Sequence, residues 1–194
     1  ALGTEPRPAN FADVEQHLTI AKADVIFAAY GFNESFAGES GLPEFRQKLM
    51  TYVAGLKAKA FNGKTGPRIV LVSPIANENV KGVAAADRNN KNIAAYTKVM
   101  REVAMAQNVG FVDAFAPTEK AMASGGSDLT INGCHLNDEG YRLLGSELFK
   151  QTFGKSAPTV NEDVRALVQE KNKQFFRRYR PVHKIGRASC RERV

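Results

Sequence analysis

The sequence predicts one α/β domain built on a parallel β-sheet, and two features carry that prediction. Continuous apolar runs at residues 24–30 and 68–74 have the composition of strands that are covered on both faces. Segments with apolar residues at helical spacing separate these runs from each other and from a shorter strand at residues 110–115. Such alternation is typical of parallel βαβ units, so the loops that follow the strands should gather at one edge of the sheet.

Apolar periodicity also places the helices. A polar segment at residues 77–90 precedes the third long helix, and a short helix is expected before Ser127. Asp138 is a plausible N-cap for the helix that it opens, because an aspartate can accept from a free N–H of the first turn. The longer predicted helices span residues 11–22, 43–61, about 92–107, 138 to about 153, and 161–179.

The composition is that of an ordinary globular protein. Of 194 residues, 43% are apolar and 24% are charged, a balance that allows a sizeable buried core. The longest apolar stretch, residues 23–32, is interrupted by Asp24 and is too short to span a bilayer. The two cysteines, Cys134 and Cys190, lack the spacing of metal ligands. The sequence also lacks a phosphate-loop motif and a Gly-x-Gly-x-x-Gly motif, so we expect neither a metal nor an organic cofactor.

The net charge of +7 comes from the C-terminal end of the chain. Residues 171–194 contain nine basic residues and one acid, net +8, which leaves −1 for the 170 residues before them. A nucleic-acid-binding domain carries its positive charge across a folded face. The neutral body therefore argues against nucleic acid as a partner, with binding through the basic tail as the alternative.

The first motif is GFNES at residues 31–35, directly after the first predicted strand. Gly31 allows a sharp turn there, and Asn33 can aim its side-chain amide over the sheet edge. An amide donates hydrogen bonds without titrating, so it is suited to stabilising a developing oxyanion. Taken alone, a glycine and an asparagine after a strand more often form only a turn.

The second motif is NGCHLNDEGY at residues 132–141. Here His135 lies in a polar loop just ahead of a helix, where solvent reaches it and neighbouring groups can orient it. These conditions suit a general base, which must take up a proton and hand it on. The alternative for a lone loop histidine is simple exposure without a role.

Together, and in this order, the two motifs resemble those of the SGNH/GDSL hydrolase superfamily. In that family a Gly-x-Asn-Asp block follows a strand, and an Asp-x-x-His block precedes the last helix. The first motif is similar to the former block, with Asn33 at the oxyanion-hole position, Gly31 shaping the loop and Glu34 where aspartate is usual. The second is similar to the latter block, with His135 at the position of the catalytic base and Asn132 at that of the acid.

The resemblance covers about residues 10–153 and implies a three-layer, flavodoxin-like sandwich around a parallel sheet. It implies serine acyl transfer by an esterase or carbohydrate-ester deacetylase, with a small-molecule or carbohydrate ester as the substrate. It also favours a bacterial, extracytoplasmic protein with no membrane span and with further domains beyond both ends of this chain.

One departure from the family pattern concerns the nucleophile. The family's serine lies in a Gly-Asp-Ser block after the first strand of five, and this sequence contains no such block. Only 23 residues precede the first predicted strand, too few for two more strands, a helix and their loops. We therefore expect a fragment with strands three to five, which does not turn over esters by itself. Ser35 and Ser73 fit turn and strand-end roles better than that of a nucleophile, which needs a strained Gly-flanked elbow.

The other departure is Asn132, which stands where an acid is usual. Its carbonyl can hold the orientation of His135 but cannot stabilise an imidazolium by charge, and in a serine protease this exchange costs about 10⁴ in rate. Asp128 is an alternative support for His135. The alternative function is a non-catalytic ligand-binding or docking module on the same fold, for which Asn132 is the best feature.

The chain divides by sequence into three parts. Residues 1–157 form the predicted hydrolase domain, and residues 158–184 form a basic helical extension that opens at Pro158. Within it, residues 164–181 resemble the extension that follows the hydrolase domain in large bacterial extracytoplasmic proteins. The last ten residues, 185–194 (IGRASCRERV), instead resemble the translation of a common sequencing adapter and are expected to be an artefactual tail.

Overall fold

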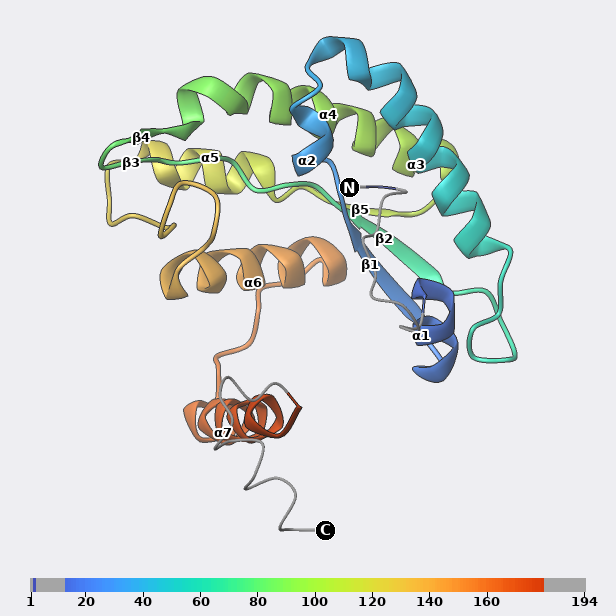
Figure 1. Cartoon of the computed structure of the whole chain (residues 1–194). Coiled ribbons are helices and arrows are strands. Elements are labelled where there is room, and N and C mark those ends of the chain that lie inside the picture. Colours follow the sequence, from blue (N-terminus) through green and yellow to red (C-terminus); the bar gives the residue numbers. More distant parts are fainter. Residues whose placement is uncertain (1, 3–12, 180–194) are drawn as a thin grey trace. The chain divides into compact units, whose positions relative to one another are not determined.

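The computed structural model describes Leu2 and residues 13–179 (Figure 1). Its contacts divide the chain into two compact units, Ala1–Ala157 and Pro158–Val194, and each is described by itself. The first unit has a parallel sheet with helices on both faces, so the predicted α/β class is confirmed. Parts of the predicted first helix and of the basic tail, and all of residues 185–194, lie outside the described residues.

Three parallel strands form the sheet, in the order β1 (Val25–Ala29), β2 (Arg68–Val72) and β5 (Gly110–Val112). The register pairs Ala29 with Val72 and Val72 with Val112. The carboxyl ends of the three strands therefore lie level, and the loops that follow them start at one edge of the sheet.

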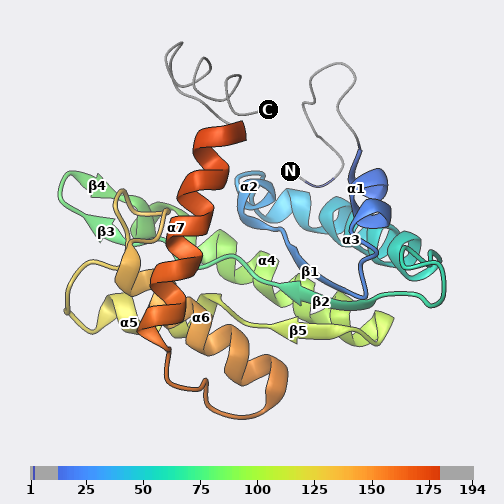
Figure 2. The ribbon, with the colours of Figure 1, turned by 90° about the horizontal axis from the view of Figure 1, so that it is seen from below.

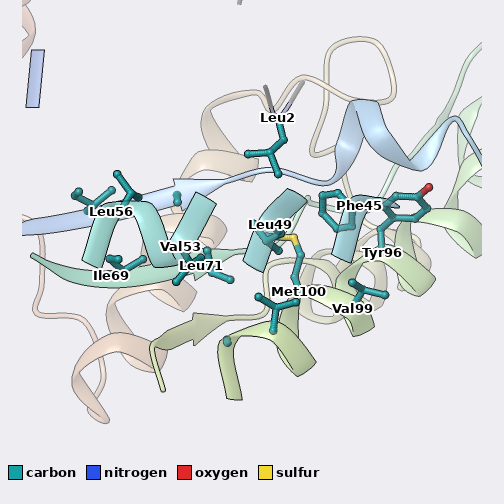
Figure 3. Close-up of a cluster of buried hydrophobic side chains, with 14 of the residues drawn as sticks. Leu2, Phe45, Leu49, Val53, Leu56, Ile69, Leu71, Tyr96, Val99 and Met100 are labelled. Atoms are coloured by element: carbon teal, nitrogen blue, oxygen red, sulfur yellow. The ribbon is translucent and has the colours of Figure 1, made fainter. Parts of the chain in front are cut away.

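One face of the sheet packs against α3 (Leu42–Lys57) and α4 (Ala85–Gln107). Helical spacing directs the apolar residues of both helices toward the strands, where Ile69 and Leu71 of β2 meet them (Figure 3). Burying each such side chain contributes about 1.5–3 kcal/mol, so this layer is the main source of stability. The most deeply buried members include Leu49, Val53, Tyr96, Met100 and Val103.

The other face of the sheet is covered by α6 (Asp138–Phe153). Leu144 and Leu148, one turn apart on this helix, pack against Val72 and Val112. Figure 2 shows α6 beside β5, the strand farthest from β1. The layers are therefore α3 with α4, the sheet, and α6, as the resemblance implies.

Strand β1 differs from the prediction that both of its faces are covered. Ile26 and Ala28 belong to the core under α3 and α4, whereas Val25 and Phe27 are 41% and 50% exposed. The reason is that α6 packs over β5 and β2, which leaves the second face of β1 open in the described part of the chain. The prediction is wrong for this strand.

Helix α4 starts at Ala85, seven residues before its predicted start. A hairpin of β3 (Asn79–Val80) and β4 (Val83–Ala84) occupies the segment predicted to be simply polar. Asn79 Oδ1 accepts the Ala86 N–H at 3.0 Å, which satisfies a free donor at the start of the helix.

Helix α6 has the predicted bounds but not the predicted cap. Asn137 is the N-cap, because its Oδ1 accepts the Gly140 N–H at 3.0 Å. Asp138 is the first helical residue, where a negative charge interacts favourably with the helix dipole.

The remaining elements are short or belong to the second unit. The second unit contains α7, which agrees with the helix predicted at residues 161–179. None of the helices in the described ranges is both long and apolar enough to cross a membrane. The bounds are α1 Val14–Ile20, α2 Phe32–Ser35, η1 Glu39–Gly41, α5 Phe115–Ala123 and α7 Glu162–Tyr179.

Candidate active site

Both motif loops lie at the edge of the sheet where the strands end. Helix α2, which carries Asn33, follows β1 directly, and the loop at residues 128–137, which carries His135, precedes α6. Figure 1 shows α2 and the start of α6 on the side of the sheet to which β1 leads. The segment after β2 contacts both loops, through Pro74 on one side and Asn77 on the other.

Gly31 turns the chain from β1 into α2 in a conformation that requires glycine. Its φ is +100°, and a Cβ there would lie 3.0 Å from Met100 Sδ and 3.3 Å from Pro74 Cγ. The Glu34 carboxylate accepts the Gly31 N–H at 2.9 Å and so holds the turn from inside. Glu34, at the position where the family usually has aspartate, is thus a capping residue of this loop.

Tyr96 of α4 anchors the far end of the same loop. Its hydroxyl donates to the Gly38 carbonyl at 2.9 Å. Burial raises the pKa of Tyr96, with smaller contributions from the negative charges of Glu34 and Glu44. The hydroxyl therefore stays protonated and keeps donating this bond.

Asn33 presents its side chain to solvent from the first turn of α2. In the part of the chain that the structure describes, its amide makes no hydrogen bond, while its neighbour Phe32 packs against the core. The Asn33 amide is therefore free to donate to a ligand at the sheet edge.

The loop at residues 128–137 is a closed turn. Thr130 and Leu136 form an antiparallel bridge, and the Ile131 N–H donates to the His135 carbonyl at 2.8 Å. Asn77 Nδ2 donates to the Gly133 carbonyl at 2.6 Å, which joins the turn to the segment after β2. The backbone around His135 is consequently fixed at the edge that α2 also occupies.

Asn132 orients the exposed ring of His135. His135 Nδ1 lies 3.0 Å from Asn132 Oδ1, and the same oxygen accepts the His135 backbone N–H at 3.0 Å. Because an amide oxygen can only accept, a hydrogen bond at this contact requires the ring proton on Nδ1, which leaves the lone pair of the neutral ring on Nε2. This is the tautomer that a general base acting through Nε2 needs.

The structure does not support Asp128 as the residue that orients His135. Within the described ranges, the Asp128 carboxylate makes no hydrogen bond to the ring, and its backbone carbonyl accepts from Asn137. Cys134 Sγ does lie 3.3 Å from His135 Nδ1. No group of three or more histidine, cysteine or acidic side chains among the described residues could hold a metal ion.

The two serines near the edge have the structural roles predicted for them. Ser35 is buried, and its hydroxyl donates to the Phe32 carbonyl at 2.6 Å. Ser73 is also buried, and its Oγ accepts the N–H groups of Ala114 and Phe115 at 2.8 and 3.1 Å. Neither hydroxyl is placed as a nucleophile.

Sequence reasoning missed Asn77 and Glu78, which are 2% and 6% exposed. Both bind the loop of His135, more than fifty positions along the chain. The available signal was two polar residues only a few positions after a buried strand, where loops over the sheet edge begin. Composition alone assigned them to a polar segment without a role.

The sequence profile of the GDSL-like Lipase/Acylhydrolase family matches residues 4–143, which include both motif loops. The chain belongs to this family. The resemblance drawn from the two motifs is thereby confirmed, and the chain is assigned to a family of ester hydrolases.

Solved structures of ester hydrolases share the fold. An acetylxylan esterase from Geobacillus stearothermophilus is 17% identical with a TM-score of 0.56, and the match covers 75% of this chain and 67% of that one. A lipase/acylhydrolase from Enterococcus faecalis is 21% identical with a TM-score of 0.51, over 73% and 67% of the two chains. The chain thus spans about two thirds of the length of each enzyme. A search of curated protein sequences gives no match.

Proposed function

We propose that this chain carries the general base and an oxyanion donor of a serine-type ester hydrolase, an esterase or carbohydrate-ester deacetylase. The observation that supports this most directly is the contact between His135 Nδ1 and Asn132 Oδ1, which leaves Nε2 free at the edge where Asn33 is exposed. An extracytoplasmic location belongs to the same proposal and rests on the family resemblance alone.

The relatives support the class of substrate and the roles. The matching esterase acts on acetylated xylan, and its described catalytic variants replace a serine, an aspartate or a histidine by alanine. That aspartate and that histidine are three positions apart, which is also the spacing of Asn132 and His135. An acetylated carbohydrate is therefore the substrate to test first.

The proposed reaction is acyl transfer in two steps. A serine oxygen attacks the ester carbonyl while His135 Nε2 takes the hydroxyl proton, and the Asn33 amide donates to the resulting oxyanion. Collapse breaks the bond to the alcohol, which leaves with the proton from His135. Water, deprotonated by His135, then attacks the acyl-enzyme, so that the acid is released and the serine regains its proton.

We propose that the nucleophile of this reaction is not among these 194 residues. The sequence has no Gly-Asp-Ser block, and Ser35 and Ser73 are buried in structural bonds. We therefore expect a chromogenic acetyl ester to be hydrolysed no faster in the presence of this chain than it is spontaneously. Turnover that disappears in His135→Ala would show instead that the site is complete.

A polypeptide that also includes the Gly-Asp-Ser block tests the two roles. We expect His135→Ala to lower kcat by about 10³-fold or more, and Asn33→Ala by about 10²–10³-fold, with smaller effects on KM. His17→Ala changes a histidine of α1, outside the site, and is the matched control. Unchanged turnover in His135→Ala would refute the assignment of the base.

The second candidate is a binding module without catalysis, and the neutral Asn132 favours it. Such a module would bind acetylated xylo-oligosaccharides with chemical-shift changes at Asn33 and His135. It would also stay inactive when the Gly-Asp-Ser block is present. Turnover in that longer polypeptide decides against the module.

A further inference from the structure

Glu78 is the buried acidic side chain of the described residues, and neither the family resemblance nor the proposed reaction gives it a role. It follows β2 by a few positions and opens the segment that leads into the β3–β4 hairpin. No ion pair of Glu78 occurs within the described ranges. A buried carboxylate without a cation must be satisfied by neutral donors, so its partners indicate its purpose.

Among the described residues, all the donors that reach the Glu78 carboxylate belong to the loop of His135. The Leu129 N–H lies 3.0 Å from both carboxylate oxygens, and the Thr130 N–H lies 2.8 Å from Oε2. The Thr130 hydroxyl donates to the same oxygen at 2.6 Å. Hydrogen bonds to an ionised acceptor are roughly twice as strong as neutral ones, so this arm of the loop is firmly held.

The backbone of Glu78 holds the other arm. Its N–H donates to the Gly133 carbonyl at 2.9 Å, beside the bond from Asn77. The Thr130 hydroxyl in turn accepts the Gly133 N–H at 3.0 Å, which links the two arms. Gly133 has a φ of +88°, and a Cβ there would lie 2.9 Å from the Glu78 carbonyl, so the two backbones are in close contact.

Apolar packing does little to fix the part of the loop that carries the ring. Asn132 and His135 are exposed, and Ile131 is 71% exposed. Leu136, the first well-buried apolar residue after His135, lies at the base of the loop. Polar bonds therefore determine where the imidazole stands.

We propose that Glu78 is a positioning residue for His135: one side chain and its own backbone N–H clamp both arms of the loop that presents the base. The importance of this clamp for catalysis rests on the proposed function of His135. Its mechanical part, the ordering of residues 129–135, does not.

The test measures loop order directly in the full chain. Glu78→Gln keeps one acceptor oxygen but removes the negative charge and turns the other oxygen into an NH₂ group that faces the Leu129 N–H, so the bonds from this arm become weaker, neutral ones. We expect hydrogen exchange of the Ile131 N–H, which closes the loop, to rise by about ten-fold or more. Exchange of the Met100 N–H, in the core of α4, should change by less than about two-fold.

Thr130 gives a matched pair that leaves the charge unchanged. Thr130→Val removes the hydroxyl's bonds to Glu78 and to the Gly133 N–H while keeping the shape, and Thr130→Ser keeps both bonds. We expect faster Ile131 exchange in the valine variant and nearly normal exchange in the serine variant. If Glu78→Gln does not fold, this pair decides the question.

A second readout reports on the histidine itself. In ¹⁵N-histidine spectra, the neutral ring should have its proton on Nδ1 in the parent chain and should lose that preference in Glu78→Gln and Thr130→Val. Val53→Ala, a core variant on α3, controls for a loss of stability alone and should leave the tautomer unchanged. An unchanged tautomer and unchanged Ile131 exchange in folded Glu78→Gln would overturn the proposal.

The two proposals fail separately. One outcome is faster exchange in the Glu78 and Thr130 variants with full turnover by His135→Ala in the polypeptide that contains Gly-Asp-Ser. It would support the role of Glu78 in ordering the loop and refute His135 as the base. The opposite outcome is normal exchange in the same variants with lost turnover in His135→Ala. It would support His135 as the base and refute the role of Glu78 in ordering the loop.

Discussion

At the scale of single residues, side chains that bind backbone N–H groups shape the candidate site. Glu34 accepts from Gly31, Asn132 accepts from His135, and Glu78 accepts from the arm of the loop that begins at Leu129. Each bond satisfies a donor that the turn would otherwise leave free. An exposed site can be ordered in this way without being buried, because these hydrogen bonds require only that the fold brings the loops together.

Gly31→Ala tests the tightest of these turns. The φ of +100° strains any residue with a Cβ, and the added atom would press on Met100 and Pro74. We expect a loss of about 1–3 kcal/mol in the free energy of unfolding. Urea denaturation followed by circular dichroism measures it.

Gly154→Ala is the control for that variant. Gly154, which follows the last residue of α6, also has a positive φ, +68°, but no atom lies within 4 Å of its added Cβ. Its loss should be smaller, because only the backbone strain remains. Equal losses at the two positions would show that the contacts with α4 and Pro74 do not matter.

At the scale of elements, apolar patterns predicted the strands and most helices because burial itself imposes those patterns. Strand β2 and helix α3 bury the residues that the periodicity selects. The apolar pattern cannot predict a boundary that polar side chains determine. An example is the early start of α4, where Asn79 accepts the Ala86 N–H. It also could not reveal that one face of β1 is open, since that depends on where α6 packs.

The same limit applies to the site. Asn33 and His135 could be predicted because their chemistry and their positions after a strand and before a helix are local features of the sequence. Glu78 could not, because its donors lie 51 and 52 positions away. Only the fold brings that carboxylate to the loop, and a polar residue after a strand is otherwise expected to be exposed.

The N-cap of α6 offers a sharp test at this scale, since the sequence predicts Asp138 and the structure places Asn137 there. Asn137→Ala removes the acceptor of the Gly140 N–H and should cost about 1 kcal/mol of stability. Asp138→Ala removes only a favourable charge in the first turn and should cost roughly 0.3–1 kcal/mol, less at high salt. Chemical denaturation of both variants compares them. A larger and salt-independent loss for Asp138→Ala would contradict the cap.

At the scale of the whole sheet, β1 is an edge strand with one open face in the described part of the chain. Within the described residues it pairs with β2 alone, and Val25 and Phe27 expose apolar surface on the face that α6 leaves open. An edge strand with an apolar face is a template for pairing with another chain. The fold therefore combines a well-packed layer under α3 and α4 with an edge strand that can pair with another chain.

We expect the chain to self-associate through this edge, increasingly so at higher concentration. Phe27→Lys places a charge on the open face of β1 and should shift the population toward monomer, because pairing would bury that charge. Phe36→Lys is the matched control: Phe36 is 61% exposed but is the C-cap of α2 and does not belong to the strand. Sedimentation velocity across a wide range of concentrations measures the effect. A sharp, monomeric thermal transition of the unmodified chain, or equal effects of the two lysines, would show that β1 is not the contact.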